Sequence, residues 1–148
     1  MSSLVQQKFG QAAAEYATSS VHASGPSLTR LVELIEPKPT WRHLDIACGA
    51  GHTALAFAPK VAKVTASDVT PEMLAQTRAL AKERKLGNVV TSQAPAHDLP
   101  FPDTSFHLVT CRTRSPSLPQ SESLCARGGA RAHPRRHVCA RRQHLARR

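Results

Sequence analysis

The sequence predicts an α/β domain built on a parallel sheet, followed by a basic tail. Strand-like apolar runs alternate with helix-like segments over residues 1–111, which is the pattern of a parallel sheet with flanking helices. A Gly-X-Gly turn follows the first of these runs. Residues 1–111 hold 10 basic and 9 acidic side chains, whereas residues 112–148 hold 10 basic and 1 acidic side chain. The two parts of this 148-residue chain therefore need separate interpretations.

The N-terminal part begins with two helix-like segments. Residues 4–20 are rich in Ala and Gln, which favour helices, and Gly10 interrupts them. A turn at 24–27 precedes a second segment, 28–35, whose large aliphatic residues fall on one helical face. This helix must end before Pro37, because the residue before a proline avoids the helical region.

The Gly-X-Gly turn lies between the first two predicted strands in the sequence. Residues 41–48 read as a short buried strand that leads into the glycine turn at 49–51. The apolar, Ala-rich residues 52–58 predict a short helix, and residues 63–67 predict a second strand that ends at Asp68.

A well-marked helix and two further strands complete the domain. Thr70 can cap the helix, Pro71 suits its first position, and the helix is expected to run to about Lys85, with Gly87 as the stop. The strands that follow are predicted at 88–92 and 106–111, separated by a Pro-rich loop at 95–104.

Composition excludes several classes of protein. No run approaches the roughly 18–20 consecutive apolar residues of a membrane span, and the start of the chain lacks the apolar centre of a secretion signal. Four cysteines in a chain without such a signal favour a reducing compartment. We therefore expect a cytoplasmic protein without a membrane span.

The ends of the first two strands predict a ligand site. Ligands of open α/β sheets lie beyond the carboxyl ends of the strands, and glycines such as Gly49 and Gly51 let the backbone approach them closely. An acidic residue such as Asp68, at the end of the second strand, can accept both hydroxyls of a ribose. Together with Asp45, this pattern predicts a nucleoside-containing ligand. The alternatives are that Asp45 only bonds to its own turn and that Asp68 only caps the next helix.

Three segments, in order, carry a family resemblance: LDIACGAGHTAL, ASDVTPEMLAQTR and HDLPFPDTSFHLVTCR. Over about residues 5–112 the chain resembles class I S-adenosylmethionine-dependent methyltransferases of the type 11, ubiquinone/menaquinone-biosynthesis-like subgroup. The resemblance implies a Rossmann-like sheet, S-adenosyl-L-methionine as cofactor, methyl transfer to a small-molecule acceptor and no required metal. No catalytic residue can be assigned.

The resemblance also implies cofactor-binding residues. Asp45 would lie near the amino-acid end of the cofactor and Asp68 at its ribose. The full set is Asp45, Ala47, Gly49, Gly51, Asp68, Val69, Met73, Ala96, His97 and Cys111. Met73 could instead belong to the core. His107 replaces the Asp that the family commonly has after Phe in the fourth strand, which predicts weaker hydrogen bonding there.

Residues 113–148 do not resemble the family. Relatives continue with a helix, a fifth strand and an antiparallel pair, whereas this segment is rich in Arg and has no aromatic residue. We expect it to be disordered, because it holds too little apolar surface to offset its chain entropy. Its composition is typical of GC-rich DNA read out of frame, so we expect 1–112 to be a partial methyltransferase domain, truncated by a frameshift and weakly active at most.

The tail leaves two other interpretations open. One is a non-catalytic nucleoside-binding module whose Arg-rich arm binds nucleic acid through phosphates, a contact that could also be incidental. The other is a zinc site at Cys125, His133, His137 and Cys139, although its spacing is poor. If the tail forms no structure, Phe106, Leu108 and Val109 should form an exposed apolar sheet edge.

Overall fold

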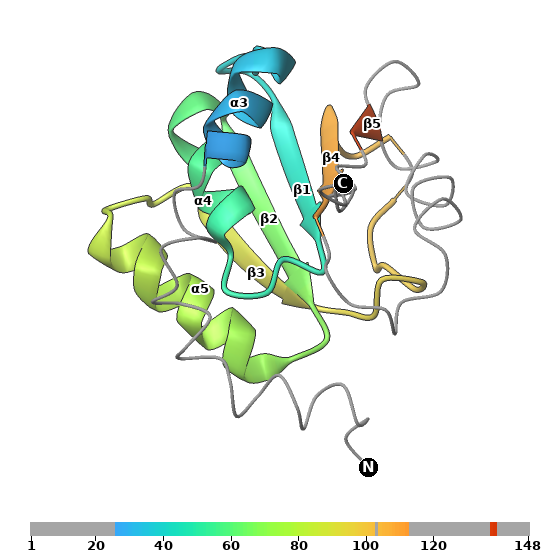
Figure 1. The fold of residues 1–148 in the computed structure, drawn as a ribbon. Coiled ribbons are helices and arrows are strands. Elements are labelled where there is room, and N and C mark those ends of the chain that lie inside the picture. Colours follow the sequence, from blue (N-terminus) through green and yellow to red (C-terminus); the bar gives the residue numbers. More distant parts are fainter. Residues whose placement is uncertain (1–25, 103, 113–136, 139–148) are drawn as a thin grey trace, which may run out of the picture.

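A computed structural model of the chain describes residues 26–102, 104–112 and 137–138 (Figure 1). These residues form a five-stranded sheet in the order β3-β2-β1-β4-β5, in which all neighbouring strands are parallel. The helices are α3 (Pro26–Ile35), α4 (His52–Phe57), the 3-10 turn η1 (Ala58–Lys60) and α5 (Pro71–Glu83). The strands are β1 (Arg42–Ile46), β2 (Lys63–Asp68), β3 (Val89–Gln93), β4 (Leu108–Cys111) and β5 (His137–Val138). The α/β class and the four predicted strands are confirmed.

The two faces of the sheet are covered differently. Helices α3, α4 and α5 lie on one side of the sheet (Figure 1), where α4 contacts β1 and β2 and α5 contacts β2 and β3. The apolar cluster on this helical face comprises Trp41, Ala54, Phe57, Ala58, Val61, Val64, Ala66 and Leu108. The second cluster combines residues from β1 and β4 with the loop between β3 and β4: Leu44, Ile46, Ala94, Leu99, Phe106, Val109 and Cys111. Each central strand is thus buried on both faces, as in most parallel sheets.

Helix α5 begins as predicted and ends differently. Pro71 occupies its first turn after Thr70, although the Thr70 side chain makes no capping bond. At its end, Lys85 adopts a left-handed conformation with φ of 56°. The Lys85 N–H donates to the Lys82 carbonyl at 3.1 Å, and the Leu86 N–H to the Ala81 carbonyl at 2.9 Å. These are the two bonds of a Schellman cap. The prediction of Gly87 as the stop is therefore wrong, because Lys85 takes the position that usually selects glycine.

Strand β4 is not an exposed edge. Its inner side pairs with β1, and on its outer side Val109 and Thr110 pair with His137 and Val138 of β5. Phe106, Leu108 and Val109 are 7%, 0% and 5% exposed, so the expected apolar edge is wrong. Apart from β5, the tail 113–148 lies outside the described residues, as does the predicted helix 4–20.

His107 takes part in the sheet just before β4 begins. Its imidazole Nδ1 accepts the Arg42 backbone N–H at 3.0 Å, and the backbone N–H of His107 donates to the Arg42 carbonyl at 2.8 Å. An imidazole nitrogen thus accepts a backbone N–H at the position where the family commonly has an aspartate.

Candidate functional site at the carboxyl ends of strands β1 and β2

The loop between β1 and α4 has a strained, compact backbone. Ala47, Gly49 and Gly51 have φ of 52°, 57° and 83°, all in the left-handed region. Glycine adopts this region freely, whereas a residue with a Cβ pays about 1–2 kcal/mol. The sequence thus places glycine at two of the three left-handed positions. At the third, Ala47 adopts a strained backbone conformation.

Gly51 is also needed for space. A Cβ on Gly51 would lie 2.5 Å from Cγ2 and 2.6 Å from Oγ1 of Thr77 on α5. The Thr77 hydroxyl lies 3.1 Å from the carbonyls of Gly49 and Met73, to which it can donate. Helix α5 therefore packs directly against the glycine loop and fixes its position.

Asp68 joins the same loop to the end of β2. Its Oδ2 accepts the Gly49 N–H at 2.8 Å and its Oδ1 accepts the Thr70 N–H at 2.9 Å. The side chain thus does bond to the start of α5, as the helix-capping alternative proposed, and it also reaches the glycine loop. A carboxylate has about four acceptor positions, so these two bonds leave room for a ligand hydroxyl.

Asp45 is a buried carboxyl that lies one residue before the end of β1. It is 1% exposed, and its Oδ1 accepts the Thr110 hydroxyl of β4 at 2.7 Å. Burial raises its pKa to about 7, with Asp68 adding to the rise, while the Thr110 hydroxyl, the Ala54 backbone N–H and Arg112 oppose it. Its Oδ2 is buried and has no hydrogen-bond partner. A buried, unpartnered carboxylate oxygen is costly, and a ligand that donates to it would remove this cost.

The other predicted site residues surround these strand ends. Val69 is half-buried and its carbonyl accepts the Gln93 side chain at 3.3 Å, while Met73 is 3% exposed on α5. Ala96 is half-buried and packs, as Ala47 does, against the cluster that contains Cys111; His97 is exposed. The predicted residues thus lie on both faces of the sheet near its carboxyl edge.

Sequence reasoning missed Thr77, Thr110 and His43. Thr110 faces Asp45 directly in the β1–β4 register, and His43 lies on the same face of β1 because it is two residues before Asp45. The spacing of His43 and Asp45 was visible in the sequence. The β4 partner could not be found without the register.

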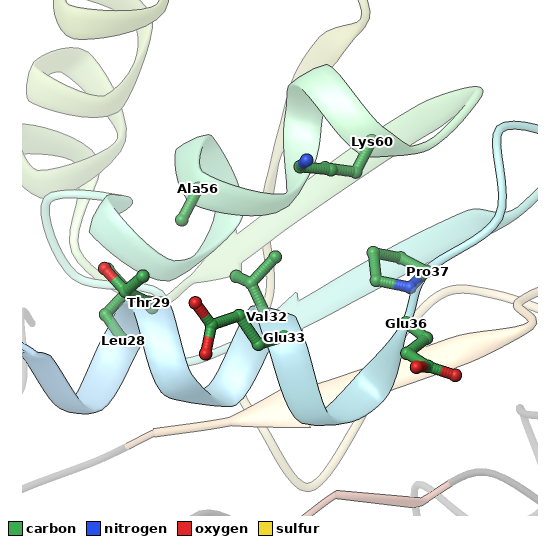
Figure 2. Close-up of a pocket in the computed structure, with 8 residues that line it drawn as sticks. All are labelled: Leu28, Thr29, Val32, Glu33, Glu36, Pro37, Ala56 and Lys60. Atoms are coloured by element: carbon green, nitrogen blue, oxygen red, sulfur yellow. The ribbon is translucent and has the colours of Figure 1, made fainter.

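A separate hollow of about 540 Å³ lies between α3 and the α4–η1 segment (Figure 2). It is lined by Leu28, Thr29, Val32, Glu33, Glu36, Pro37, Ala56 and Lys60. None of the predicted cofactor residues lines it, so it is distinct from the strand-end site.

Among the described residues, no helix is long and apolar enough to cross a membrane. The proposed zinc ligands Cys125, His133 and Cys139 lie outside the described residues, and of His137 only the backbone is described.

Comparisons with known proteins agree with this geometry. The methyltransferase domain family matches residues 44–127, a range that extends past residue 112. The uncharacterized methyltransferase YcgJ of Bacillus subtilis is 41% identical over 104 residues, which are 70% of this chain and 41% of YcgJ. Its crystal structure superposes with a TM-score of 0.66 at 36% identity, over 72% of this chain and 45% of that chain.

Two relatives with named reactions are also similar. Aklanonic acid methyltransferase DauC of Streptomyces sp. strain C5 is 34% identical over 126 residues, covering 83% of this chain and 57% of DauC. The ubiquinone/menaquinone biosynthesis C-methyltransferase UbiE of Teredinibacter turnerae is 40% identical over 83 residues, covering 53% of this chain and 33% of UbiE. The chain thus spans 33% to 57% of the length of these three relatives. It belongs to the S-adenosylmethionine-dependent methyltransferase family.

Proposed function

We propose that this chain binds S-adenosylmethionine at the carboxyl ends of β1 and β2, and that its reaction is methyl transfer to a small-molecule acceptor. The observation that carries the proposal is the unpartnered Oδ2 of buried Asp45, beside a left-handed glycine loop that is bonded to Asp68. A cationic donor would satisfy the buried oxygen of Asp45. A Cβ on Gly49 would meet nothing within 4 Å, so there is space beside the loop for a ligand to approach its backbone. The residues present therefore fit this cofactor.

Each carboxylate would hold one part of the cofactor. Asp45 would accept a hydrogen bond from the ammonium group of the methionine end, which supplies both a donor and a positive charge. Asp68 would accept the ribose hydroxyls with the acceptor positions that Gly49 and Thr70 leave free. The Ala47–Gly51 loop would pass close to the cofactor between them.

The remaining predicted residues would enclose the adenine and the methyl group. Val69 and Met73 would lie beside the adenine, with Ala96 and His97 across from them in the loop after β3. Cys111 would lie near the methyl donor, at the end of β4. These assignments rest on family resemblance and on the position of each residue near the carboxyl edge of the sheet.

The bound cofactor supplies an electrophilic methyl group, and transfer is an in-line displacement that needs the acceptor close to it. A small-molecule acceptor is supported by the similarity to DauC and UbiE, whose names give aklanonic acid and the quinone pathway as their context. The described residues offer no base that can be assigned to an acceptor. A reducing, cytoplasmic location is part of the proposal, in keeping with Cys48 and Cys111, neither of which forms a disulfide in the described part of the chain.

Isothermal titration of the full chain with S-adenosylmethionine tests the binding. Asp68→Ala should weaken binding about a hundredfold, because it removes charge-assisted bonds to two hydroxyls. Glu83→Ala, an exposed change at the end of α5, should leave affinity unchanged and is the matched control. Absence of binding by the wild-type chain, with folding verified by circular dichroism, would refute the proposal.

We also propose that the methyltransferase segment ends near residue 112, where the composition changes, although the family match extends to 127. If a frameshift produced the basic tail, another reading frame of the coding DNA after codon 112 should encode a helix and a further strand. Sequencing of the gene and translation in all frames would decide this. The proposal fails if no frame restores such elements.

A further inference from the structure

A chain of hydrogen bonds runs under the candidate site through the helical face of the sheet. His43 Nε2 lies 2.8 Å from Thr110 Oγ1, and the Thr110 hydroxyl donates to Asp45 Oδ1 at 2.7 Å. All three side chains are at most 1% exposed. Thr110 of β4 thus bonds to two residues of β1: Asp45, which lies directly opposite it in the register, and His43, which lies diagonally to it.

The bond directions follow from the chemistry of the three groups. Because the Thr110 hydrogen is given to Asp45, the Thr110 oxygen is left to accept the hydrogen on His43 Nε2. His43 therefore carries a proton on Nε2. Burial lowers its pKa to about 3, so the ring is neutral near pH 7 and this proton is its only one on nitrogen. Its Nδ1 is buried without a partner.

An imidazole is an unusual occupant of this position. The ring packs against Phe57 of α4 at 4.8 Å between centroids, and its register partners on β2 and β4 are Val64 and Leu108. An apolar side chain would fill this part of the helical-face cluster without burying polar nitrogen, whose burial is unfavourable. His43 must offset that cost through its bond to Thr110.

We propose that His43 and Thr110 are positioning residues that together hold Asp45 in one rotamer and favour its ionised form, with Oδ2 presented to the ammonium group of the cofactor. The ligand part of this inference rests on the proposed function. The effect on Asp45 itself does not, because it concerns the ligand-free protein. Neither residue is within the glycine loop or the predicted ribose contact.

Two charged groups also act on Asp45, and two titratable groups belong to the elements beside it. Asp68 at the end of β2 raises the pKa of Asp45 and Arg112 after β4 lowers it. In the loop, burial raises the pKa of the Cys48 thiol, so Cys48 is neutral. Helix α4 contributes His52 at its first position. The variants below leave all four groups in place, so that a change in Asp45 can be assigned to the chain of bonds.

The first test measures Asp45 directly by carbon-13 NMR titration of the full chain without ligand. Thr110→Val keeps the shape of the side chain and removes the donor, so the pKa of Asp45 should rise above the wild-type value. Thr110→Ser keeps the hydroxyl and should retain it. An unchanged titration of Asp45 in folded Thr110→Val would overturn the inference, whatever the result of ligand binding.

The second test compares two ligands that differ at one end. S-adenosylhomocysteine carries the ammonium group, whereas 5′-methylthioadenosine keeps the nucleoside and lacks it. Thr110→Val and His43→Leu should weaken S-adenosylhomocysteine about tenfold at pH 7, recover part of this at pH 8.5, and leave methylthioadenosine unchanged. His43→Gln, whose amide can replace Nε2, should restore affinity.

Equal weakening of both ligands would indicate general damage to the fold and would overturn the positioning role. Unchanged affinity of both ligands in both apolar variants would overturn it as well. If the wild-type chain binds neither ligand, the proposed function fails, and the NMR titration still decides whether His43 and Thr110 act on Asp45.

Discussion

The ends of β1 and β2 each present an aspartate, and the two side chains are in opposite situations. Both oxygens of Asp68 accept backbone N–H groups, one from the glycine loop and one from the start of α5. Asp45 has one oxygen bonded to Thr110 and one that is buried without a partner, and burial raises its pKa to about 7. Asp68 therefore fixes the backbone of the glycine loop and of the start of α5, whereas Asp45 has an oxygen, Oδ2, that can accept a hydrogen bond from a ligand.

This difference shows that environment, more than residue type, decides what a carboxylate does. Asp68 is the last residue of β2, where an N–H of the glycine loop and an N–H at the start of α5 both donate to it, so its charge is satisfied within the protein. Asp45 lies between α4 and β4, where the Thr110 hydroxyl donates to Oδ1 and Oδ2 is buried without a hydrogen-bond partner. A ligand would thus supply the missing hydrogen-bond donor for Asp45 Oδ2, whereas for Asp68 it would add a bond to two that already exist.

The largest expected effect comes from the loop that joins the two strand ends. Gly51→Ala should destabilise the domain by about 3 kcal/mol, because the left-handed φ is strained and the new Cβ overlaps Thr77. Urea denaturation measures this. Thr77→Ala in the same background should recover part of the loss. If the stability loss of the double variant equals the sum of the losses of the two single variants, the contact between α5 and the loop is not the reason that glycine is required at position 51.

A matched pair of isosteric changes tests the comparison directly. Asp68→Asn should cost about 2 kcal/mol at pH 7, because its amide would face a backbone N–H that the carboxylate now accepts. Asp45→Asn should change stability by less than about 1 kcal/mol, since it also removes a buried charge. Equal losses in the two variants, measured by urea denaturation, would show that the two aspartates are not in different situations.

The pH dependence of stability should separate Asp45 from His43. The pKa of Asp45 rises from 3.8 to about 7 on folding, so its contribution falls as pH increases through this range. The pKa of His43 falls from 6.5 to about 3, so its contribution increases with pH between these values. The two nearly cancel in the wild-type chain between pH 4 and 6.5.

Replacing either residue should reveal the pH dependence that the other one gives to stability. Relative to wild type, Asp45→Asn should gain stability as pH increases from 4 to 6.5, and His43→Leu should lose it, each by at most about 1.4 kcal/mol per pH unit. Denaturation at several pH values checks both slopes. Parallel curves for wild type and both variants would mean that neither group is buried in the way described.

The smallest expected effect is a gain. Ala47→Gly should stabilise the chain by up to about 1 kcal/mol, because glycine adopts φ of 52° without strain, less the entropy that it adds to the unfolded chain. Ala79→Gly, on the exposed face of α5, should instead cost about 1 kcal/mol and serves as control. A loss from Ala47→Gly in thermal unfolding would contradict the strained loop.

Local chemistry made much of the fold predictable. Apolar runs placed the four main strands within a few residues, and Thr70-Pro71 located the start of α5. Its end was mispredicted, because the choice of Lys85 for the left-handed cap depends on how the chain turns toward β3 rather than on glycine preference. The pairing of β5 with β4 was also missed, since two residues in a basic segment carry no strand pattern of their own.

The sequence by itself determined the order of elements, the glycine loop and the two aspartates at the strand ends, because periodicity and backbone freedom are properties of neighbouring residues. Only the tertiary structure decided what those aspartates contact. Thr110 is 65 residues from Asp45 and meets it through the β1–β4 register. Burial, hydrogen-bond partners and the pKa shifts of Asp45 and His43 all depend on atoms brought together by that register, which no local pattern specifies.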